Sequence, residues 1–181
     1  MEPQAEAKGI LAVITGDGKG KTTSAIGTAV RALGYGHKVI MIQFIKGDWH
    51  YGEIDGIERL APDFVLERAG LGFYKIMGDD RPEEAHKQAA LKGLMRAQEV
   101  ITSGEYQLVI LDEINNAVKE GLLTIEQVLE VVDKKPPLLH LILTGRYAHP
   151  RLMEKADLVS EVREIKHPYK KGILAQRGFD F

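Results

Sequence analysis

Cysteine is absent from the 181-residue sequence, which excludes disulfide bonds, thiolate metal sites and cysteine nucleophiles. The longest apolar runs stop at about eight residues, too short to cross a bilayer, so we expect no membrane association. The polar start of the chain, residues 1–8, lacks the apolar core of a signal peptide. The expected location is therefore the cytoplasm.

A large excess of charge of one sign is also missing. The 24 basic and 26 acidic side chains give a formal net charge of -2, whereas nucleic-acid-binding domains are usually strongly basic. We therefore expect no nucleic-acid partner. Any anion bound by this protein must be held by local backbone amides and a few cations, because the global field is weak.

The sequence does contain short apolar runs separated by helix-compatible stretches. The runs cover residues 10–15, 38–45, 106–111 and 138–143, with a weaker one at 158–165, and helical stretches cover 21–33 and 82–102. A shorter helix begins at Thr124, which forms a capping-box pattern with Gln127. Since the runs do not alternate, they predict a mainly parallel sheet flanked by helices on both faces. We predict one α/β domain over residues 10–181, preceded by a flexible N-terminal arm at 1–9.

A glycine-rich loop joins the first apolar run to the first helical stretch. Glycines let backbone amides turn toward a ligand, and the helix N-terminus adds unpaired N–H groups, so this pattern predicts a phosphate site. Lys21 can reach phosphate oxygens and Thr22 can offer its hydroxyl to Mg²⁺. The predicted nucleotide-binding residues of the loop are Gly16, Asp17, Gly18, Lys19, Gly20, Lys21, Thr22 and Thr23.

The spacing of this loop departs from the standard Gly-x4-Gly-Lys-Thr. Counting back from Gly20 places Thr15 at the first position, and Gly16 follows one residue late. Lys19 adds a second cation. A turn without a ligand is the alternative, but the strand, the glycines, the Lys-Thr pair and the helix all occur in the required order.

Two acids follow the third apolar run. Asp112 and Glu113 resemble a Walker B element, in which an acid at a strand end holds Mg²⁺ directly or through water. Alternatively, Asp112 could cap a helix starting at Ile114. In many P-loop ATPases a glutamate in the position of Glu113 activates a water for attack on the γ-phosphate. The two motifs thus indicate Mg·ATP and leave the reaction open.

Further segments beyond the loop point to one family. They are Gln43-Phe44-Ile45-Lys46-Gly47 with Trp49, Gly52 and Glu53; Leu111-Asp112-Glu113; Thr144-Gly145-Arg146 with His149; Ala156-Asp157; Ser160-Glu161; Lys166-His167-Pro168; and Gly172, Ala175-Gln176 and Gly178. Together with the variant loop, their order and spacing resemble the P-loop corrinoid adenosyltransferases (ATP:cob(I)alamin adenosyltransferases) over nearly the whole chain from residue 10 onward.

The resemblance implies a RecA-like P-loop fold and a specific reaction. The Co(I) of a reduced corrinoid attacks the 5′ carbon of ATP, and the whole triphosphate leaves. The phosphates lie in the loop in the reverse sense, with the α-phosphate where other P-loop proteins hold γ. Lys21, Lys19 and Glu113 would then be catalytic, and Mg²⁺ would be held by Thr22 and Glu113, with Asp112 as a further candidate. A homodimer and a reduced flavoprotein electron donor are also implied.

The corrinoid site implied by the resemblance falls on residues 70–75. Phe73 is the best candidate for an aromatic side chain at the cobalt, followed by Tyr74 and Leu71, although the sequence departs here from the family's usual Gly-Phe-Thr-Trp. A loop aromatic packed into the core is the alternative. Trp49 could line the nucleotide or corrinoid pocket, or anchor a loop at its rim. Arg146 is expected to bind a phosphate, or to pair with an acid at a dimer interface.

Several expectations remain for the other residues and for the reaction. His86 and His37 are expected to face solvent, whereas His149 and His167 are expected to cap or to donate and accept hydrogen bonds. Because the N-terminal arm is short, any cover over the active site is either shortened or supplied by another part of the chain. An ATPase or nucleotide kinase acting at the γ-phosphate is the main competing function, and a non-catalytic nucleotide or corrinoid carrier is the second.

Overall fold

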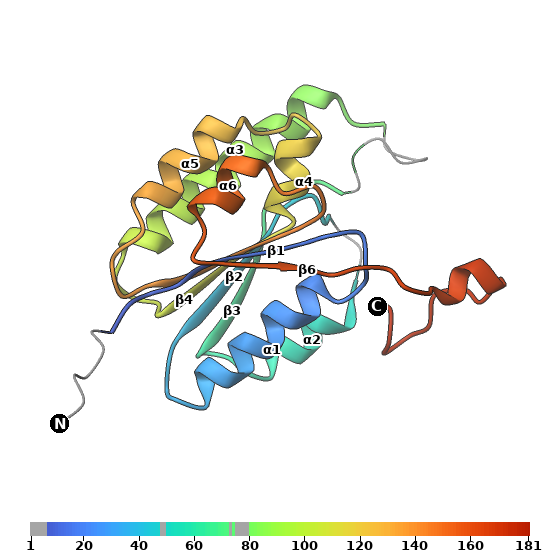
Figure 1. Cartoon of the computed structure of the whole chain (residues 1–181), viewed down its shortest axis with the longest axis horizontal. Coiled ribbons are helices and arrows are strands. Elements are labelled where there is room, and N and C mark those ends of the chain that lie inside the picture. Colours follow the sequence, from blue (N-terminus) through green and yellow to red (C-terminus); the bar gives the residue numbers. More distant parts are fainter. Residues whose placement is uncertain (1–6, 48–49, 73, 75–79) are drawn as a thin grey trace.

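The computed structural model describes residues 7–47, 50–72, 74 and 80–181, which form a sheet between two layers of helices (Figure 1). Within these residues, six strands pair in parallel in the order β3-β2-β4-β5-β1-β6. The strands are β1 (Leu11–Thr15), β2 (Val39–Gln43), β3 (Phe64–Arg68), β4 (Leu108–Asp112), β5 (His140–Thr144) and β6 (Leu158–Glu161). The helices are α1 (Lys21–Leu33), α2 (Gly52–Glu58), α3 (Glu83–Thr102), α4 (Ile114–Lys119), α5 (Ile125–Asp133) and α6 (Pro150–Lys155), followed by a 3-10 turn at Pro168–Lys171.

The two faces of the sheet carry separate cores. Helices α3, α4, α5 and α6 cover one face, and α1 and α2 cover the other (Figure 1). Along β2, Ile40 and Ile42 face the α3 side while Val39 and Met41 face the α1 side, since successive side chains of a strand point to opposite faces. All four are buried, which explains why the strand sequence is apolar throughout.

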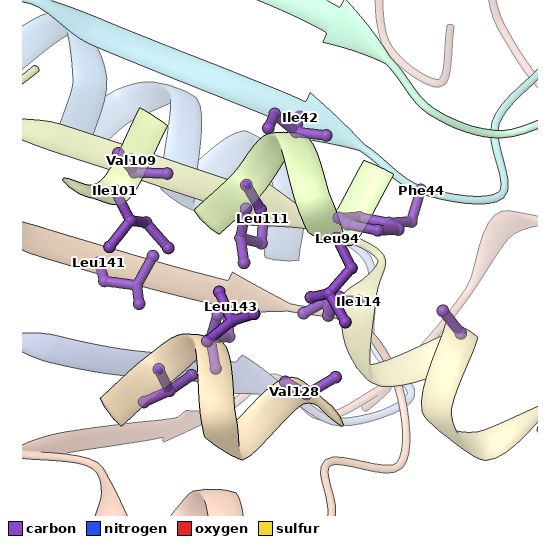
Figure 2. Packing of buried hydrophobic residues seen from close by; sticks show 14 of the residues in the cluster. Ile42, Phe44, Leu94, Ile101, Val109, Leu111, Ile114, Val128, Leu141 and Leu143 are labelled. Carbon is purple, nitrogen blue, oxygen red and sulfur yellow. The ribbon is translucent and has the colours of Figure 1, made fainter. Parts of the chain in front are cut away.

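The larger core lies on the α3 side of the sheet. Figure 2 shows Leu94 and Ile101 of α3 among the same buried cluster as Val109 and Leu111 of β4. Val128 of α5 closes the cluster from the neighbouring helix. These contacts fix both helices over the central strands, so the loops at the strand ends start from rigid positions.

The strand register brings the ends of four strands to one edge. Gln43 at the end of β2 lies opposite Asp112 at the end of β4. Thr144 at the end of β5 lies opposite Ile14, one residue before Thr15 at the end of β1. Polar side chains that are far apart in the sequence therefore meet at the carboxyl edge, where ligands of parallel sheets bind.

The predicted fold class is confirmed. All five predicted runs are strands, and the capping box of α5 is formed, with the Gln127 amide donating to Thr124 Oγ1 at 3.2 Å. β5 lies between β1 and β4, the arrangement of RecA-like P-loop folds. None of the helices in the described parts of the chain is long and apolar enough to cross a membrane.

Some elements were not predicted. β3 is an edge strand whose residues after Phe64 are only partly buried, so it lacks a continuous apolar run. Helices α2, α4 and α6 have six or seven residues, too few to establish a helical period. The weak run at 158–165 is a strand over only Leu158–Glu161, at the opposite edge of the sheet.

Candidate active site

The glycine-rich loop forms the floor of a pocket of 470 Å³ at the carboxyl edge of the sheet. The loop leaves β1 at Thr15 and enters α1 at Lys21, and no side chain caps the helix N-terminus. The pocket is lined by Asp17, Gly18, Lys19, Gly20, Lys21, Thr22 and Thr23, together with Ile45, Lys46, Glu113, Asn116, Arg146, Glu164 and His167. One cavity thus brings together most of the predicted nucleotide and metal residues.

The three glycines of the loop serve different purposes. Gly20 has φ 116°, a conformation that favours glycine, and a Cβ there would meet nothing within 4 Å. At Gly16 and Gly18 a Cβ would lie 2.3 Å from the Val162 carbonyl oxygen and 2.7 Å from the Arg163 carbonyl carbon. The Gly18 amide donates to the Val162 carbonyl at 2.8 Å. Gly16 and Gly18 therefore allow the segment after β6 to pack on the loop, and the Gly18 amide does not turn to the pocket as the sequence suggested.

The two loop lysines have different partners. Lys21 is 8% exposed, its Nζ donates to the Gly18 carbonyl at 2.7 Å, and burial lowers its pKa. Lys19 is more exposed and lies 3.0 Å from Asp180 Oδ1. Lys21 thus stabilises the loop by a buried hydrogen bond within it, while Lys19 forms an ion pair with a residue near the end of the chain.

Asp112 is the centre of a buried hydrogen-bond network. It is fully buried, and its Oδ1 accepts from Thr22 Oγ1 at 2.8 Å and from Thr144 Oγ1 at 2.6 Å. Its Oδ2 accepts from Gln43 Nε2 at 3.1 Å and lies 3.3 Å from Lys46 Nζ. The alternative in which Asp112 caps α4 is wrong, because the N-cap residue is Glu113 and no side chain caps the helix. Both oxygens of Asp112 are occupied, so this side chain orients Thr22.

Glu113 is the acid that reaches the pocket. Its backbone adopts φ 63°, an unusual conformation for a residue with a side chain, and its amide donates to Thr144 Oγ1 at 3.0 Å. Burial, followed by the charge of Asp112, raises the pKa of Glu113. Thr144 therefore links both acids, accepting from the backbone of one and donating to the side chain of the other.

The residues of this pocket fit a magnesium ion. The Thr22 hydroxyl donates a hydrogen bond to Asp112, which leaves the lone pairs of Oγ1 available to a metal ion, and Glu113 adds a carboxylate. Among the described residues there is no cluster of three or more histidine, cysteine or acidic side chains that could hold a metal alone. Few protein ligands are the usual arrangement for Mg²⁺, which keeps waters and binds substrate phosphates.

Lys46 is a site residue for which the sequence analysis gave no role. Its side chain is 15% exposed and lies 3.1 Å from Glu53 Oε1 and 3.3 Å from Asp112 Oδ2. Burial alone would lower the pKa of Lys46, but these two carboxylates raise it overall. Its position just after β2, at the ligand-binding edge, is the signal that could have identified it.

Arg146 lines the pocket from the end of β5. The preceding Gly145 has φ 126°, and a Cβ there would lie 2.7 Å from Asn116 Oδ1. That oxygen accepts from the Arg146 amide at 2.5 Å. The exposed guanidinium is thus placed beside the phosphate loop, with the Arg146 backbone held by the Asn116 side chain of α4.

The segment expected to bind the corrinoid is only partly within the described residues. Phe73 and Trp49 lie outside them, whereas Leu71 and Tyr74 are described. Tyr74 packs on the α3-side core, with its ring 5.1 Å from that of His86, and so adopts the alternative given for a loop aromatic. Leu71 lines a separate cavity of 330 Å³ between β3 and α3.

The start of this segment is fixed by backbone contacts to the pocket over the glycine-rich loop. The Gly72 amide donates to the Ile45 carbonyl at 3.2 Å. A Cβ at Gly70 would lie 2.4 Å from the Ile45 carbonyl carbon, and one at Gly47 would lie 2.3 Å from Gly72. Since Ile45 lines the nucleotide pocket, residues 70–72 lie directly behind one of its walls.

The two histidines expected to face solvent do not do so fully, since His37 is partly buried. His86 is 3% exposed, so the expectation that it faces solvent is wrong; the Tyr74 ring lies against it. His149 and His167 accept from the amides two residues on, at 3.2 Å in each case, which confirms their capping role.

The segment that borders the pocket comes from the end of the chain. The described part of the N-terminal arm lies at the amino ends of the strands, away from the pocket, where the Gly9 amide donates to the Pro137 carbonyl. Residues after β6 instead contact the loop, with the Glu164 amide 3.4 Å from Asp17 Oδ1. Glu164 had no local sequence signal, since only the pairing of β6 with β1 brings it here.

Comparison with known proteins gives one consistent result. The family model described as ATP:corrinoid adenosyltransferase BtuR/CobO/CobP matches residues 7–181. A corrinoid adenosyltransferase of Pseudomonas aeruginosa is 39% identical over 97% of this chain and 85% of its own length. The corrinoid adenosyltransferase of Escherichia coli K12 is 36% identical, and that of Salmonella typhimurium 35%, each over 97% of this chain and 87% of its own length.

Proposed function

Because this chain belongs to the ATP:corrinoid adenosyltransferase family, we propose that it transfers the 5′-deoxyadenosyl group of Mg·ATP to the Co(I) of a reduced corrinoid. The observation that supports this reaction best is the family match over residues 7–181, together with a pocket in which the phosphate-loop cations face Glu113. The activity would serve the synthesis or salvage of adenosylated corrinoids.

The reaction forms one bond and breaks another. The lone pair of Co(I) attacks the 5′ carbon, the bond from that carbon to the α-phosphate oxygen breaks, and triphosphate leaves with the electron pair. No proton is transferred, so no general base is needed. The task of the protein is to position the two substrates and to stabilise the leaving group.

The loop residues are suited to stabilise a leaving triphosphate. Lys19 and Lys21 supply positive charge, and the amides at the start of α1 are not occupied by a capping side chain. Bound Mg²⁺ would neutralise phosphate charge, held by Thr22 and Glu113. Arg146 would bind the phosphates from the β5 side. With the phosphates reversed in the loop, these groups would act at the α-phosphate, where the new charge develops.

The corrinoid is proposed to bind at residues 70–75, on the other side of the wall formed by Ile45. The glycine contacts between residues 45–47 and 70–72 support this proposal, because they keep this segment close to the nucleotide. Leu71, Phe73, Tyr74 and Trp49 remain the candidate corrinoid residues. Tyr74 would act by supporting the segment from the core.

A γ-phosphate-cleaving enzyme is the second candidate, because Glu113 lies in the pocket where such enzymes activate water. The two functions differ in their products. With cob(I)alamin under anaerobic reducing conditions, we expect the visible spectrum of an alkylated corrinoid and one triphosphate for each corrinoid consumed. Steady formation of ADP without corrinoid would instead support the second candidate, and binding of both substrates without a Co–C bond would support a carrier.

The family resemblance extends the proposal to partners. A reduced flavoprotein would supply the electron that converts Co(II) to Co(I), and the enzyme would act as a homodimer in the cytoplasm. The all-exposed edge strand β6 is compatible with a subunit contact. Light scattering of the purified protein would give the oligomeric state.

A further inference from the structure

The end of the chain forms a turn that places a carboxylate on the phosphate loop. Beyond β6 the chain extends past the sheet and then returns toward α1 and α2 (Figure 1). In the turn, the Asp180 amide donates to the Gln176 carbonyl at 2.7 Å, and the Gln176 amide donates to Asp180 Oδ2 at 2.7 Å. The Gly178 amide donates to the Phe181 carbonyl at 2.8 Å. These bonds fix the direction of the Asp180 carboxylate before it meets any partner.

The free oxygen of this carboxylate is directed at a loop cation. Asp180 Oδ1 lies 3.0 Å from Lys19 Nζ, and the Asp180 carbonyl oxygen lies 3.4 Å from the same atom. Lys19 is one of the two cations that the glycine-rich loop itself supplies to the pocket. The acceptors that hold it come from 161 residues further along the chain.

A bound triphosphate would compete with Asp180. Phosphate oxygens and the carboxylate are both anions that require the Lys19 ammonium, and at close range they repel each other. We propose that Asp180 occupies Lys19 in place of a nucleotide phosphate, and that residues 176–181 form a strap that ATP displaces. This inference rests on the ATP-binding part of the proposed function and is independent of the adenosyl transfer.

The contacts of the strap are weak enough for displacement. Residues 168–179 are all exposed, and Gly172, with φ 73°, provides a turn at which the chain can reorient. The strap differs in this from the segment before it, where Val162 and Arg163 are packed on glycines of the loop. The side chains of Lys19 and Asp180 are 40% and 20% exposed. An ion pair that remains in contact with solvent contributes little stability, so ATP has little to overcome at Lys19. Residues 162–163 would keep their place on the loop while the strap, residues 176–181, moves away.

Asp180→Asn tests the competition directly. We expect the variant to bind Mg·ATP about two- to fivefold more tightly than the parent in low salt, the effect of removing one competing ion pair near the surface. Calorimetry would measure both affinities. The difference should shrink in about 1 M salt, where the screening length is short. Asp133→Asn is the matched control, because it removes the same charge from a lysine pair with Lys155, outside the pocket, and should leave ATP affinity unchanged.

Hydrogen exchange supplies a second measurement that does not depend on the variant. We expect amides of residues 176–181 to exchange faster when ATP is bound. Slower exchange there, or equal or weaker ATP binding by Asp180→Asn, would overturn the strap. If the parent protein bound no ATP, both the proposed function and the strap hypothesis would be wrong. Intact adenosyl transfer with no effect at Asp180 would overturn the strap alone.

Discussion

At the scale of single residues, the two neighbouring acids have separate roles that mutation can distinguish. Asp112 is buried, with three hydrogen-bond donors and the Lys46 ammonium on its carboxylate, whereas Glu113 lines the pocket. In Asp112→Asn, the NH₂ group that replaces either oxygen faces two of these partners, and Lys46 loses a counter-charge. We expect a loss of about 1–3 kcal/mol of unfolding free energy in urea titrations, the cost of a buried polar group left without its partner.

Glu113→Gln is the matched variant for this comparison. Burial already disfavours the charged form of Glu113, and no hydrogen bond of its carboxylate is lost, so we expect the neutral variant to be as stable as the parent or more stable. Both variants should require more Mg²⁺ for half-maximal ATP binding, because one misorients Thr22 and the other removes a ligand. Equal stability of the two variants would contradict the assignment of Asp112 as a buried positioning residue.

The residue scale also shows why the sequence identified only part of this network. Asp112 and Glu113 stand at the end of an apolar run, so their position was readable. Thr144 ends β5 and Lys46 follows the end of β2 by three residues, so only their place at the carboxyl edge of the sheet pointed to a role, because neither residue type indicates a specific chemistry there. Their roles depend on the strand order, which sets β2 and β5 on either side of β4 and so brings both side chains to Asp112, and this appears only in three dimensions.

At the scale of elements, the contact between the phosphate loop and the segment after β6 depends on glycine. Gly18→Ala would place a methyl group 2.7 Å from the Arg163 carbonyl carbon, so the segment must shift. We expect a loss of about 1–3 kcal/mol of stability, the range for overpacking, and weaker ATP binding. Gly27→Ala in α1 is the control, since its Cβ meets nothing within 4 Å and should stabilise the helix by about 0.5–1 kcal/mol. Similar effects of both substitutions would argue against this contact.

The start of β5 contains a pH-sensitive contact. His140 Nδ1 accepts from the Ile10 amide at 3.1 Å, and burial, followed by the charges of His37 and Lys135, lowers the pKa of His140. A histidine with a depressed folded-state pKa adds stability above its unfolded pKa, about 6.5, and this stability is lost as the pH falls through the folded value. Protonation of Nδ1 would break the bond.

We therefore expect the unfolding free energy to decrease by up to about 1 kcal/mol, the worth of one hydrogen bond, as the pH falls below about 6.5. In His140→Asn, the side-chain oxygen can accept from the same amide without titrating. Denaturant titrations above and below this pH should show a smaller decrease in unfolding free energy for His140→Asn. An identical pH dependence in both proteins would mean that His140 does not contribute.

Element prediction from the sequence succeeded where burial was complete. The inner strands are covered on both faces, so their sequences are continuous apolar runs that predict buried strands; they are β1, β2, β4 and β5. β3 is a half-exposed edge strand with charged residues at its end, and its sequence resembles a loop. The short helices at the strand ends are held by tertiary contacts, which no local period reveals.

At the scale of the whole molecule, two glycine-mediated contacts connect loops that follow neighbouring strands at the carboxyl edge of the sheet. One joins the phosphate loop to the segment after β6, and the other joins residues 45–47 to residues 70–72. Both partners in each contact start from strands of the same rigid sheet. The pocket is therefore a property of the sheet edge as a unit, and a ligand that fills it should stabilise the entire fold.

This linkage leads to a test of which part of ATP the protein recognises. Ligands that bind only the folded state raise its stability by RT ln(1 + [L]/Kd), about 2.7 kcal/mol at a hundredfold excess over Kd. For a chain of this size, that corresponds to a rise of roughly 5–10 °C in Tm. Since the charged groups of the pocket gather around the phosphate loop, we expect Mg·triphosphate to produce much of the shift given by Mg·ATP, and adenosine to produce little. Lys21→Ala should remove the shift for both phosphate ligands, because Lys21 is the buried cation of the loop. A large shift with adenosine alone, or an undiminished shift in Lys21→Ala, would show that binding does not depend on the phosphate loop.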